Sequence, residues 1–423
     1  MMSQKVRDLV RLPFKYYEPK PGHPDWAAIN KDAVRLAIQI LKNQEPFSPG
    51  RKMYRSTKRV LAILKTMRNF FRNKIRMAKS NHNFIPLFYI WTMTNACNFT
   101  CSFCSNHRGG KYPLLFQKGE TRNLSTAQGK QLLGIMKDAS AIYFCGGEPT
   151  IRRDLPELLD YSSKLRIAMF NMINTNGSLI GDLLLKPRYR KFLSEMDVII
   201  VSLDAMELTK LAAICKTSES VARKVIRNIL ALRILKHFFP FKLSINIVVG
   251  QKNFHDAFDV LDWCNDLGLT FAAVAENIVD KADQGLLANP EYQQLVDKIL
   301  SRAEQGYPMI ASKYMLDRLL RAKFTSCFPR VFDHIDHDGT LFWPCKTYPQ
   351  AIKVDVLKHK NVAGVHAEAA KMINPAFFHG KGPGKCNGEC TWMQDCVTDF
   401  YAGGLIHGLF DGKLLKEIRG LLQ

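Results

Sequence analysis

The stretch WTMTNACNFTCSFC, residues 91–104, decides the fold of this chain. It closes the apolar run Phe84–Met93, which is too short to cross a bilayer as a helix and is typical of a buried strand. It then places Cys97, Cys101 and Cys104 with three residues and then two between them. Three thiols at this spacing predict a metal centre on a loop that follows a strand.

Two kinds of metal centre suit these thiols. Soft thiolates hold iron–sulfur cubes, and three of them leave the fourth iron open to a small molecule. A tetrahedral zinc site needs a fourth ligand, for which His107 is the nearby candidate. The chain has eleven cysteines, mostly clustered, and Met1–Lys20 lacks the apolar core of a secretory signal. We therefore expect metal binding in a reducing, cytoplasmic compartment rather than a disulfide scaffold.

From Phe84 onward, short apolar runs alternate with helical patterns. The expected strands are Phe84–Met93, Ala141–Cys145, Ala168–Ile173, Val198–Leu203, Leu243–Val249 and Phe271–Val274. The helices expected between them are Ser125–Asp138, Asp154–Leu165, Leu183–Met196, Ser218–Lys236 and Ala257–Leu267. Six β/α units predict an α/β protein with a parallel sheet and helices outside it.

Polar motifs follow three of these strands, where β/α enzymes build their active sites. Gly146-Gly147-Glu148-Pro149 follows the second strand, and Asn174–Gly177 follows the third. Ser202 and Asp204 stand at the end of the fourth. These groups are the candidates for binding a ligand near the cysteine loop.

The cysteine spacing, with the aromatic Phe103 before the last cysteine, and the glycine-glycine-glutamate-proline motif resemble the radical S-adenosylmethionine (SAM) superfamily. The resemblance covers roughly Phe84 to Val279. It implies a partial (β/α)6 TIM-like barrel, a 4Fe–4S cluster on the three clustered cysteines, and SAM bound to the open iron. It also implies an electron donor such as a flavodoxin or ferredoxin. One electron then cleaves SAM, and a 5′-deoxyadenosyl radical takes a hydrogen atom from a substrate C–H bond.

The same resemblance implies roles for the polar motifs. Gly146, Gly147, Glu148 and Pro149 hold the methionine amino group of SAM. A carboxylate suits this role because it accepts hydrogen bonds from an ammonium group. Asn176 belongs to the usual third-strand ending, and Ser202 and Asp204 occupy the place of residues that meet the ribose.

A second group of cysteines lies near the end of the sequence. Its members are Cys327, Cys345, Cys386, Cys390 and Cys396. With the expected hairpin around Asp338-Gly339, they resemble the auxiliary-cluster extension called SPASM, or its shorter relative called twitch. The full pattern has more cysteines than these five, so we expect one auxiliary iron–sulfur cluster. Which four cysteines hold it is open, and a zinc site on the same residues is the alternative.

A basic segment precedes the cysteine loop. The net charge of the chain is +22, residues 51–80 carry eleven Lys or Arg, and residues 46–119 contain no Asp or Glu. Met53–Met77 is helical in pattern, with an apolar stripe at Val60, Leu64, Met67, Phe71 and Ile75. An anionic membrane surface suits such a helix, and so does RNA. A helix packed on its own domain, with its charges in water, explains the pattern as well.

These features predict three parts: a basic, helical N-terminal segment over residues 1–82, a radical SAM core over 83–310, and an auxiliary-cluster domain over 311–423. We expect a cytoplasmic enzyme, with peripheral contact at the inner face of the membrane as an option. The substrate is open between a peptide or protein, a small molecule, and a lipid or lipid-linked sugar. A zinc-stabilised RNA-binding protein is the alternative from another class, but it leaves the Gly146–Pro149 motif unexplained.

Overall fold

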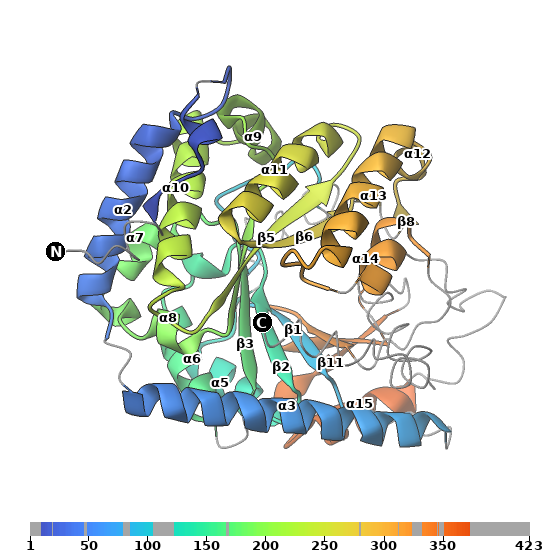
Figure 1. Cartoon of the computed structure of the whole chain (residues 1–423). Helices are drawn as coiled ribbons and strands as arrows, with labels where there is room; N and C mark the ends of the chain where they lie inside the picture. Colours follow the sequence, from blue (N-terminus) through green and yellow to red (C-terminus); the bar gives the residue numbers. More distant parts are fainter. Residues whose placement is uncertain are drawn as a thin grey trace.

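The computed structural model describes residues 10–18, 20–45, 49–78, 85–104, 122–165, 169–278, 281–311, 313–323, 332–344, 346 and 351–372. Figure 1 shows a central sheet with helices packed around it and one long helix, α3, crossing below. The five cysteines of the C-terminal group lie outside the described residues.

Six parallel strands form the centre of the molecule, in the order of the sequence. They are β1 (Phe88–Thr92), β2 (Ala141–Cys145), β3 (Phe170–Thr175), β4 (Val198–Ser202), β5 (Lys242–Val249) and β6 (Thr270–Ala275). Each of these strands pairs in parallel with the next. This arrangement confirms the predicted partial barrel. Strand β1 begins at Phe88 and ends at Thr92, so it is shorter than its apolar run.

Helices cover the outside of the sheet. They are α5 (Thr126–Ile135), α6 (Leu155–Lys164), α7 (Ile180–Leu184), η3 (Pro187–Tyr189), α8 (Phe192–Glu195), α9 (Leu208–Cys215), α10 (Glu219–Leu235), α11 (Phe254–Leu267), α12 (Gln284–Leu287), α13 (Pro290–Glu304) and α14 (Lys313–Leu320). The core fills the space between these helices and the sheet, where Trp91, Phe144 and Ile173 are fully buried. Ser125 caps α5 as predicted, through a reciprocal bond with Gln128.

Two helix predictions need correction. The single helix expected over Leu183–Met196 is broken into α7, η3 and α8, because Pro187 cannot continue a helix that begins before it. Helix α9 was not expected, and it lies beside the cysteine loop, where it matters for the site.

The C-terminal part extends the same sheet. Strand β9 (Phe332–Ile335) pairs in parallel with β1, and β10 (Thr340–Trp343) and β11 (Ile352–Asp355) follow in antiparallel order. The turn between β9 and β10 contains Gly339 at φ +87°, as the predicted hairpin requires. Helix η5 (Val356–Lys358) and helix α15 (Val362–Met372) complete this part. The sheet therefore runs across the expected boundary at residue 311, and the three-part division stays a prediction.

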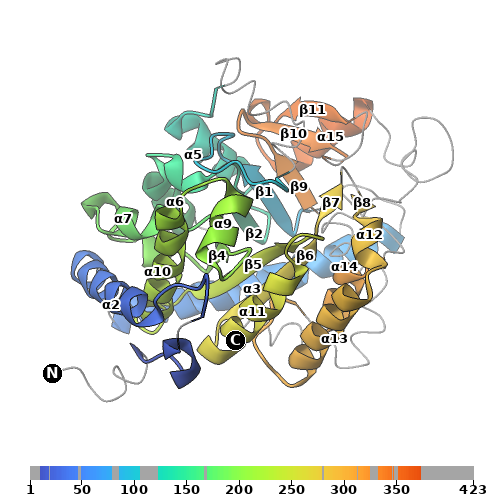
Figure 2. The same ribbon diagram turned by 90° about the horizontal axis from the view of Figure 1, so that it is seen from above.

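The N-terminal segment is helical, as expected. After η1 (Phe14–Tyr17), helix α2 (Trp26–Asn43) packs along α10, with an ion pair between Asp32 and Arg223 at 2.6 Å. Helix α3 (Pro49–Ala78) then runs across the ends of the strands, and seen from above it lies behind the sheet (Figure 2). Among the described residues, no helix combines the length and the apolar character needed to cross a membrane.

Contacts of α3 fix which strand ends it covers. Asn69 donates to the backbone oxygen of Asp138 (2.9 Å), just before β2, and Asn73 donates to that of Ile85 (2.8 Å), just before β1. Arg59 contacts Asp197, the residue before β4. All three contacts lie at the amino ends of the parallel strands, so α3 closes the end of the barrel opposite to the cysteine loop.

Candidate functional site

The cysteine loop follows β1 at the carboxyl end of the parallel strands. Within it, the Cys104 amide donates to the Cys101 carbonyl (3.1 Å), and the Phe99 amide donates to Cys97 Sγ (3.4 Å). The amide of Thr100 donates to the carbonyl of Cys215 (3.3 Å), at the end of α9. The loop thus donates one hydrogen bond to the sulfur of Cys97 and is attached to a helix from far along the chain.

The electrostatics of the thiols suit a metal centre. Burial raises the pKa of Cys97 to about 12. A hydrogen bond with the Cys215 thiol, together with burial, raises the pKa of Cys101 well above its usual value. Thiols in such surroundings ionise only when a nearby positive charge compensates the thiolates, as the irons of a cluster do. Cys215, which belongs to neither of the two cysteine groups, therefore lies next to one of the predicted ligands.

Two glycines bring the loop after β2 against the cysteine loop. The amide of Gly147 donates to Thr94 O (2.7 Å), and the amide of Glu148 donates to Ala96 O (2.8 Å). Gly146 has φ +143°, and a Cβ atom on Gly147 would lie only 2.1 Å from Ala96 O. Only glycine permits this approach, which places Glu148 directly beside the start of the cysteine motif.

Glu148 is buried and anchors the second loop to the third. Its Oε1 atom accepts hydrogen bonds from the Thr150 amide (3.1 Å) and from the hydroxyls of Thr150 (2.5 Å) and Thr175 (2.7 Å). Its Oε2 atom accepts a single bond from the Asn176 amide (2.7 Å), which leaves room for a further donor. Burial raises the pKa of Glu148, and these donors oppose that effect. An ammonium group at Oε2 would complete the solvation of the carboxylate.

The loop after β3 is tied to the cysteine loop by amide and hydroxyl side chains. Asn176 donates through Nδ2 to Asn98 Oδ1 (2.9 Å), and Asn98 donates to Ser178 Oγ (2.9 Å). Asn98 lies between Cys97 and Cys101, so these bonds help to fix the cysteine motif. The sequence marked Asn176 as a candidate, whereas Asn98 and Ser178 carried no signal of their own.

The candidates after β4 lie at the same ends of the strands. Ser202 is half-buried, and its backbone pairs with Asn246 of β5. Asp204 is buried and accepts a hydrogen bond from the Val248 amide (3.1 Å). Burial raises the pKa of Asp204 to about 7. The two residues stand on one strand end, and Asp204 lies close enough to Cys101 to influence its charge.

Arg152 is a site residue that sequence reasoning missed. Its guanidinium donates to Met93 O and to Leu124 O, both at 2.9 Å, and forms an ion pair with Asp154 at 2.6 Å. It also lies over the ring of Trp91, 5.6 Å from the centroid. Arg152 thereby holds the end of β1 in place, and its partners Trp91, Met93 and Leu124 lie too far away in sequence to be recognised.

The turn of the C-terminal hairpin reaches the base of the cysteine loop. Asn95 Nδ2 lies 3.0 Å from His337 Nδ1, and the amide of Leu124 donates to His337 O (2.9 Å). The carboxylate of Asp336 accepts a hydrogen bond from the amide of His337 (2.9 Å). Burial by itself would raise the pKa of Asp336, but the hydrogen bonds with the ring and the amide of His337 hold it below the usual value. Through His337, which Asp336 holds in place, the hairpin contacts the barrel at Asn95, two residues before Cys97.

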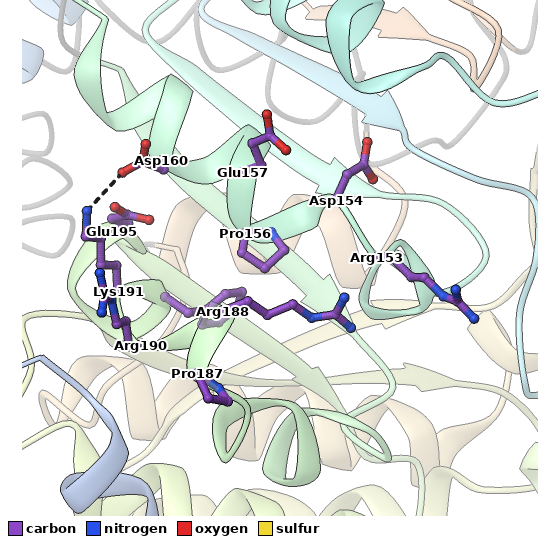
Figure 3. A pocket seen from close by; sticks show the side chains of 11 residues that line it. Arg153, Asp154, Pro156, Glu157, Asp160, Pro187, Arg188, Arg190, Lys191 and Glu195 are labelled. Atoms are coloured by element: carbon purple, nitrogen blue, oxygen red, sulfur yellow. Dashed lines mark ion pairs between the residues drawn. The ribbon is translucent and has the colours of Figure 1, made fainter.

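Figure 3 shows a separate hollow on the outer surface, between α6 and the segment η3–α8. It is lined by acids and bases in similar number, and Asp160 and Lys191 form an ion pair across it at 3.5 Å. None of the candidate site residues named above lines this hollow. Its charges largely neutralise one another, so it offers no single charge for a ligand to recognise.

Comparison with known proteins agrees with this geometry. Residues 91–266 match the family model of the Radical SAM superfamily. A probable GTP 3′,8-cyclase from Saccharolobus islandicus is 31% identical over 206 residues, which cover 48% of this chain and 60% of the relative. An Fe-coproporphyrin III synthase from Methanosarcina barkeri is 28% identical over 235 residues, or 52% of this chain and 53% of the relative. The chain therefore spans between half and two thirds of the length of these curated relatives.

A solved structure shares the fold. The SuiB protein of Streptococcus suis, bound to S-adenosylmethionine, superimposes with a TM-score of 0.54 at 16% identity, covering 73% of each chain. The family model spans the cysteine loop, the Gly146–Pro149 motif and strands β2 to β5. Proteins of this family use a 4Fe–4S cluster and SAM. Residues 91–266 of this chain therefore form a radical SAM domain.

Proposed function

We propose that the chain is a radical SAM enzyme that removes a hydrogen atom from a substrate C–H bond. In this proposal Cys97, Cys101 and Cys104 hold a 4Fe–4S cluster. The chemistry that the cluster and SAM supply when bound is one-electron cleavage of a carbon–sulfur bond, which delivers a 5′-deoxyadenosyl radical. The observation that carries the proposal is the pair of hydrogen bonds from Gly147 and Glu148 to the start of the cysteine loop. These bonds hold the loop with the three thiols against the buried carboxylate of Glu148, which supports the proposal.

The residues of the chain bind and orient the cofactors. Glu148 Oε2 accepts a hydrogen bond from the ammonium group of SAM, while its other bonds keep the carboxylate fixed. Gly146 and Gly147 allow the loop that carries Glu148 to approach the backbone of the cysteine loop. Ser202 and Asp204 are proposed to bind the ribose, since they stand at the end of β4 beside the cysteine loop. Phe99, buried within the loop, helps to exclude water.

Anaerobic reconstitution with iron and sulfide tests this assignment. We expect the wild-type chain to bind a cluster and, once reduced, to release 5′-deoxyadenosine from SAM. Cys104→Ala should abolish that release. Cys264→Ala, which removes a buried thiol from α11, serves as the matched control and should keep it. Release by Cys104→Ala at the wild-type rate would refute the ligand assignment, and bound zinc in place of iron would support the zinc alternative.

An auxiliary cluster on four of the five C-terminal cysteines is part of the proposal. The hairpin turn bonded to Asn95 supports a C-terminal part that works beside the radical site. The triple variant Cys97→Ala/Cys101→Ala/Cys104→Ala separates the two clusters. We expect it to retain about half of the wild-type iron after reconstitution. Complete loss of iron in a folded triple variant would mean that the wild-type protein holds a single cluster, on Cys97, Cys101 and Cys104.

The substrate is proposed only by class: a peptide or protein, a small molecule, or a lipid-borne group with a reactive C–H bond. The relatives are named for different products, and a further SuiB structure holds its precursor peptide SuiA, with a TM-score of 0.50 and 17% identity. These likenesses support the shared core and leave the substrate classes open. A deuterated substrate should transfer deuterium into 5′-deoxyadenosine, and a flavodoxin or ferredoxin should replace chemical reductant in the assay.

A further inference from the structure

Helix α3 presents an apolar stripe to the solvent. Of the fifteen large hydrophobic side chains that are exposed among the described residues, eight belong to this one helix. They are Met53, Tyr54, Val60, Leu61, Leu64, Met67, Phe71 and Ile75, with exposed fractions from 39% to 73%. At 100° per residue most of them fall on one side, along a helix that is about 45 Å long at 1.5 Å per residue. A contiguous apolar face of this size marks an interaction surface.

The opposite face of α3, which packs on the barrel, is largely polar, with Ala62 and Phe70 as its buried apolar members. Asn69 and Asn73 are buried, and both bond to backbone groups at the amino ends of the strands. Lys65 is buried too and donates to Lys137 O (2.7 Å). A helix of a soluble domain normally turns its apolar stripe inward. Here the fold uses the polar side for attachment, so the apolar stripe serves no packing purpose in the described part of the molecule.

The stripe is flanked by positive charge. Arg68 and Arg72 are exposed beside it, and Lys58 lies over the exposed ring of Tyr54 at 5.5 Å. The sequence places eleven Lys or Arg in residues 51–80 and no Asp or Glu from 46 to 119. A purely solvated helix would gain from alternating charges, which are missing here.

We propose that the outer face of α3 docks on an anionic lipid membrane. The apolar side chains enter the boundary between headgroups and acyl chains, and the flanking cations meet the anionic headgroups. RNA would satisfy the cations but would leave Leu64, Phe71 and Ile75 in water, so the combined pattern favours lipid. The proposal concerns binding alone and is independent of the radical chemistry proposed above.

Docking through α3 also sets the orientation of the enzyme. The helix covers the amino ends of the strands (Figures 1 and 2). The cysteine loop and Glu148 lie at the carboxyl ends. A membrane against α3 therefore lies on the far side of the barrel from the radical site. In this arrangement α3 is an anchor, and the radical site faces away from the membrane.

Vesicle sedimentation of the full chain tests the anchor. We expect binding to vesicles of phosphatidylcholine with phosphatidylglycerol, little binding to phosphatidylcholine alone, and weaker binding as salt increases. The double variant Leu64→Gln/Ile75→Gln should bind at least about tenfold more weakly. The matched control is Ile278→Gln/Met372→Gln, which alters side chains of similar exposure (52% and 56%, against 55% and 56%) on β7 (Asn277–Ile278) and α15. It should bind like the wild type.

A second variant tests the positive charges beside the stripe. The same experiment also distinguishes the membrane from two other partners of this surface, RNA and a second copy of the chain. Arg68→Glu/Arg72→Glu should also lower binding about tenfold or more, because each basic residue near an anionic surface contributes. Wild-type chain that stays in the supernatant with anionic vesicles overturns the proposal. The proposal is also overturned if the chain binds RNA and the Leu64→Gln/Ile75→Gln variant binds it as tightly as the wild type. It is overturned as well if the wild type forms a dimer that this variant dissociates, and neither protein binds vesicles.

Discussion

Gly147 is the residue at which the two loops of the site come closest. A Cβ atom there would meet Ala96 O at 2.1 Å, and the loops cannot separate without losing the bond from the Gly147 amide to Thr94. We expect Gly147→Ala to lower the free energy of unfolding by about 3 kcal/mol and to weaken SAM binding. The matched control is Gly134→Ala in α5, where the nearest atom lies at 3.7 Å. Helix propensity predicts a gain of up to about 1 kcal/mol for that variant. Equal urea midpoints for both variants would contradict the crowding argument.

Asp204 gives a prediction about pH. Burial raises its pKa from 3.8 to about 7 in the folded protein. The unfolded chain then releases this proton at lower pH than the folded chain does. The contribution of Asp204 to the free energy of unfolding is therefore fully present below about pH 4 and is lost as the pH rises to 7. Relative to Asp204→Asn, the wild type should lose on the order of 2–4 kcal/mol of unfolding free energy over this range. Parallel stability curves for the two proteins between pH 4 and pH 8 would refute the assigned shift.

Individual residues differ in how far the sequence could reveal them. Gly146–Pro149 form a contiguous motif after a strand, so they could be predicted. Arg152, Asn98 and Cys215 could not, because each acts through a partner that only the fold brings near. The bond between Asn95 and His337 joins residues 242 positions apart.

At the scale of elements, α3 reverses the usual relation between polarity and burial. Asn73 exchanges two hydrogen bonds with the backbone of Ile85, at 2.8 and 2.9 Å, and is 3% exposed. Removing one side of such a pair leaves buried groups unsatisfied. We expect Asn73→Ala to cost about 2 kcal/mol of unfolding free energy, and Leu64→Ala, at a 55% exposed position, to cost less than about 0.5 kcal/mol. Thermal unfolding in the absence of lipid measures both. A larger loss for Leu64→Ala would mean that the outer face of α3 is packed.

The existence of α3 could be predicted from its period, but its orientation could not. The sequence shows an apolar stripe and cationic flanks, which fit a membrane face, an RNA-binding helix or a helix packed on its own domain. The structure shows a helix that is packed on its own domain through Asn69 and Asn73, with the stripe turned outward. Two asparagines within a basic helix give no sign, in the sequence alone, that they are the buried contacts.

At the scale of the whole molecule, the alternation of strands and helices predicted the parallel sheet, and the family resemblance implied the partial barrel that the six strands form. It did not predict that β9 would join them beside β1, because a strand pairing is set by long-range packing rather than by local pattern. The five C-terminal cysteines fall outside the described residues, so the auxiliary cluster remains a prediction. The two ends of the barrel have separate tasks in our account: the carboxyl end holds the radical site and the amino end carries the anchor.

Electron paramagnetic resonance of the reduced, reconstituted protein tests whether the cluster has an open iron beside Glu148. With Cys97, Cys101 and Cys104 as the only protein ligands of the cluster, one iron is open, and added SAM should change the signal of the reduced cluster. Glu148→Gln should weaken this response, since an amide accepts a hydrogen bond from an ammonium group less strongly than a carboxylate does. A reduced cluster whose spectrum is unchanged by saturating SAM would contradict the assignment of an open iron beside Glu148.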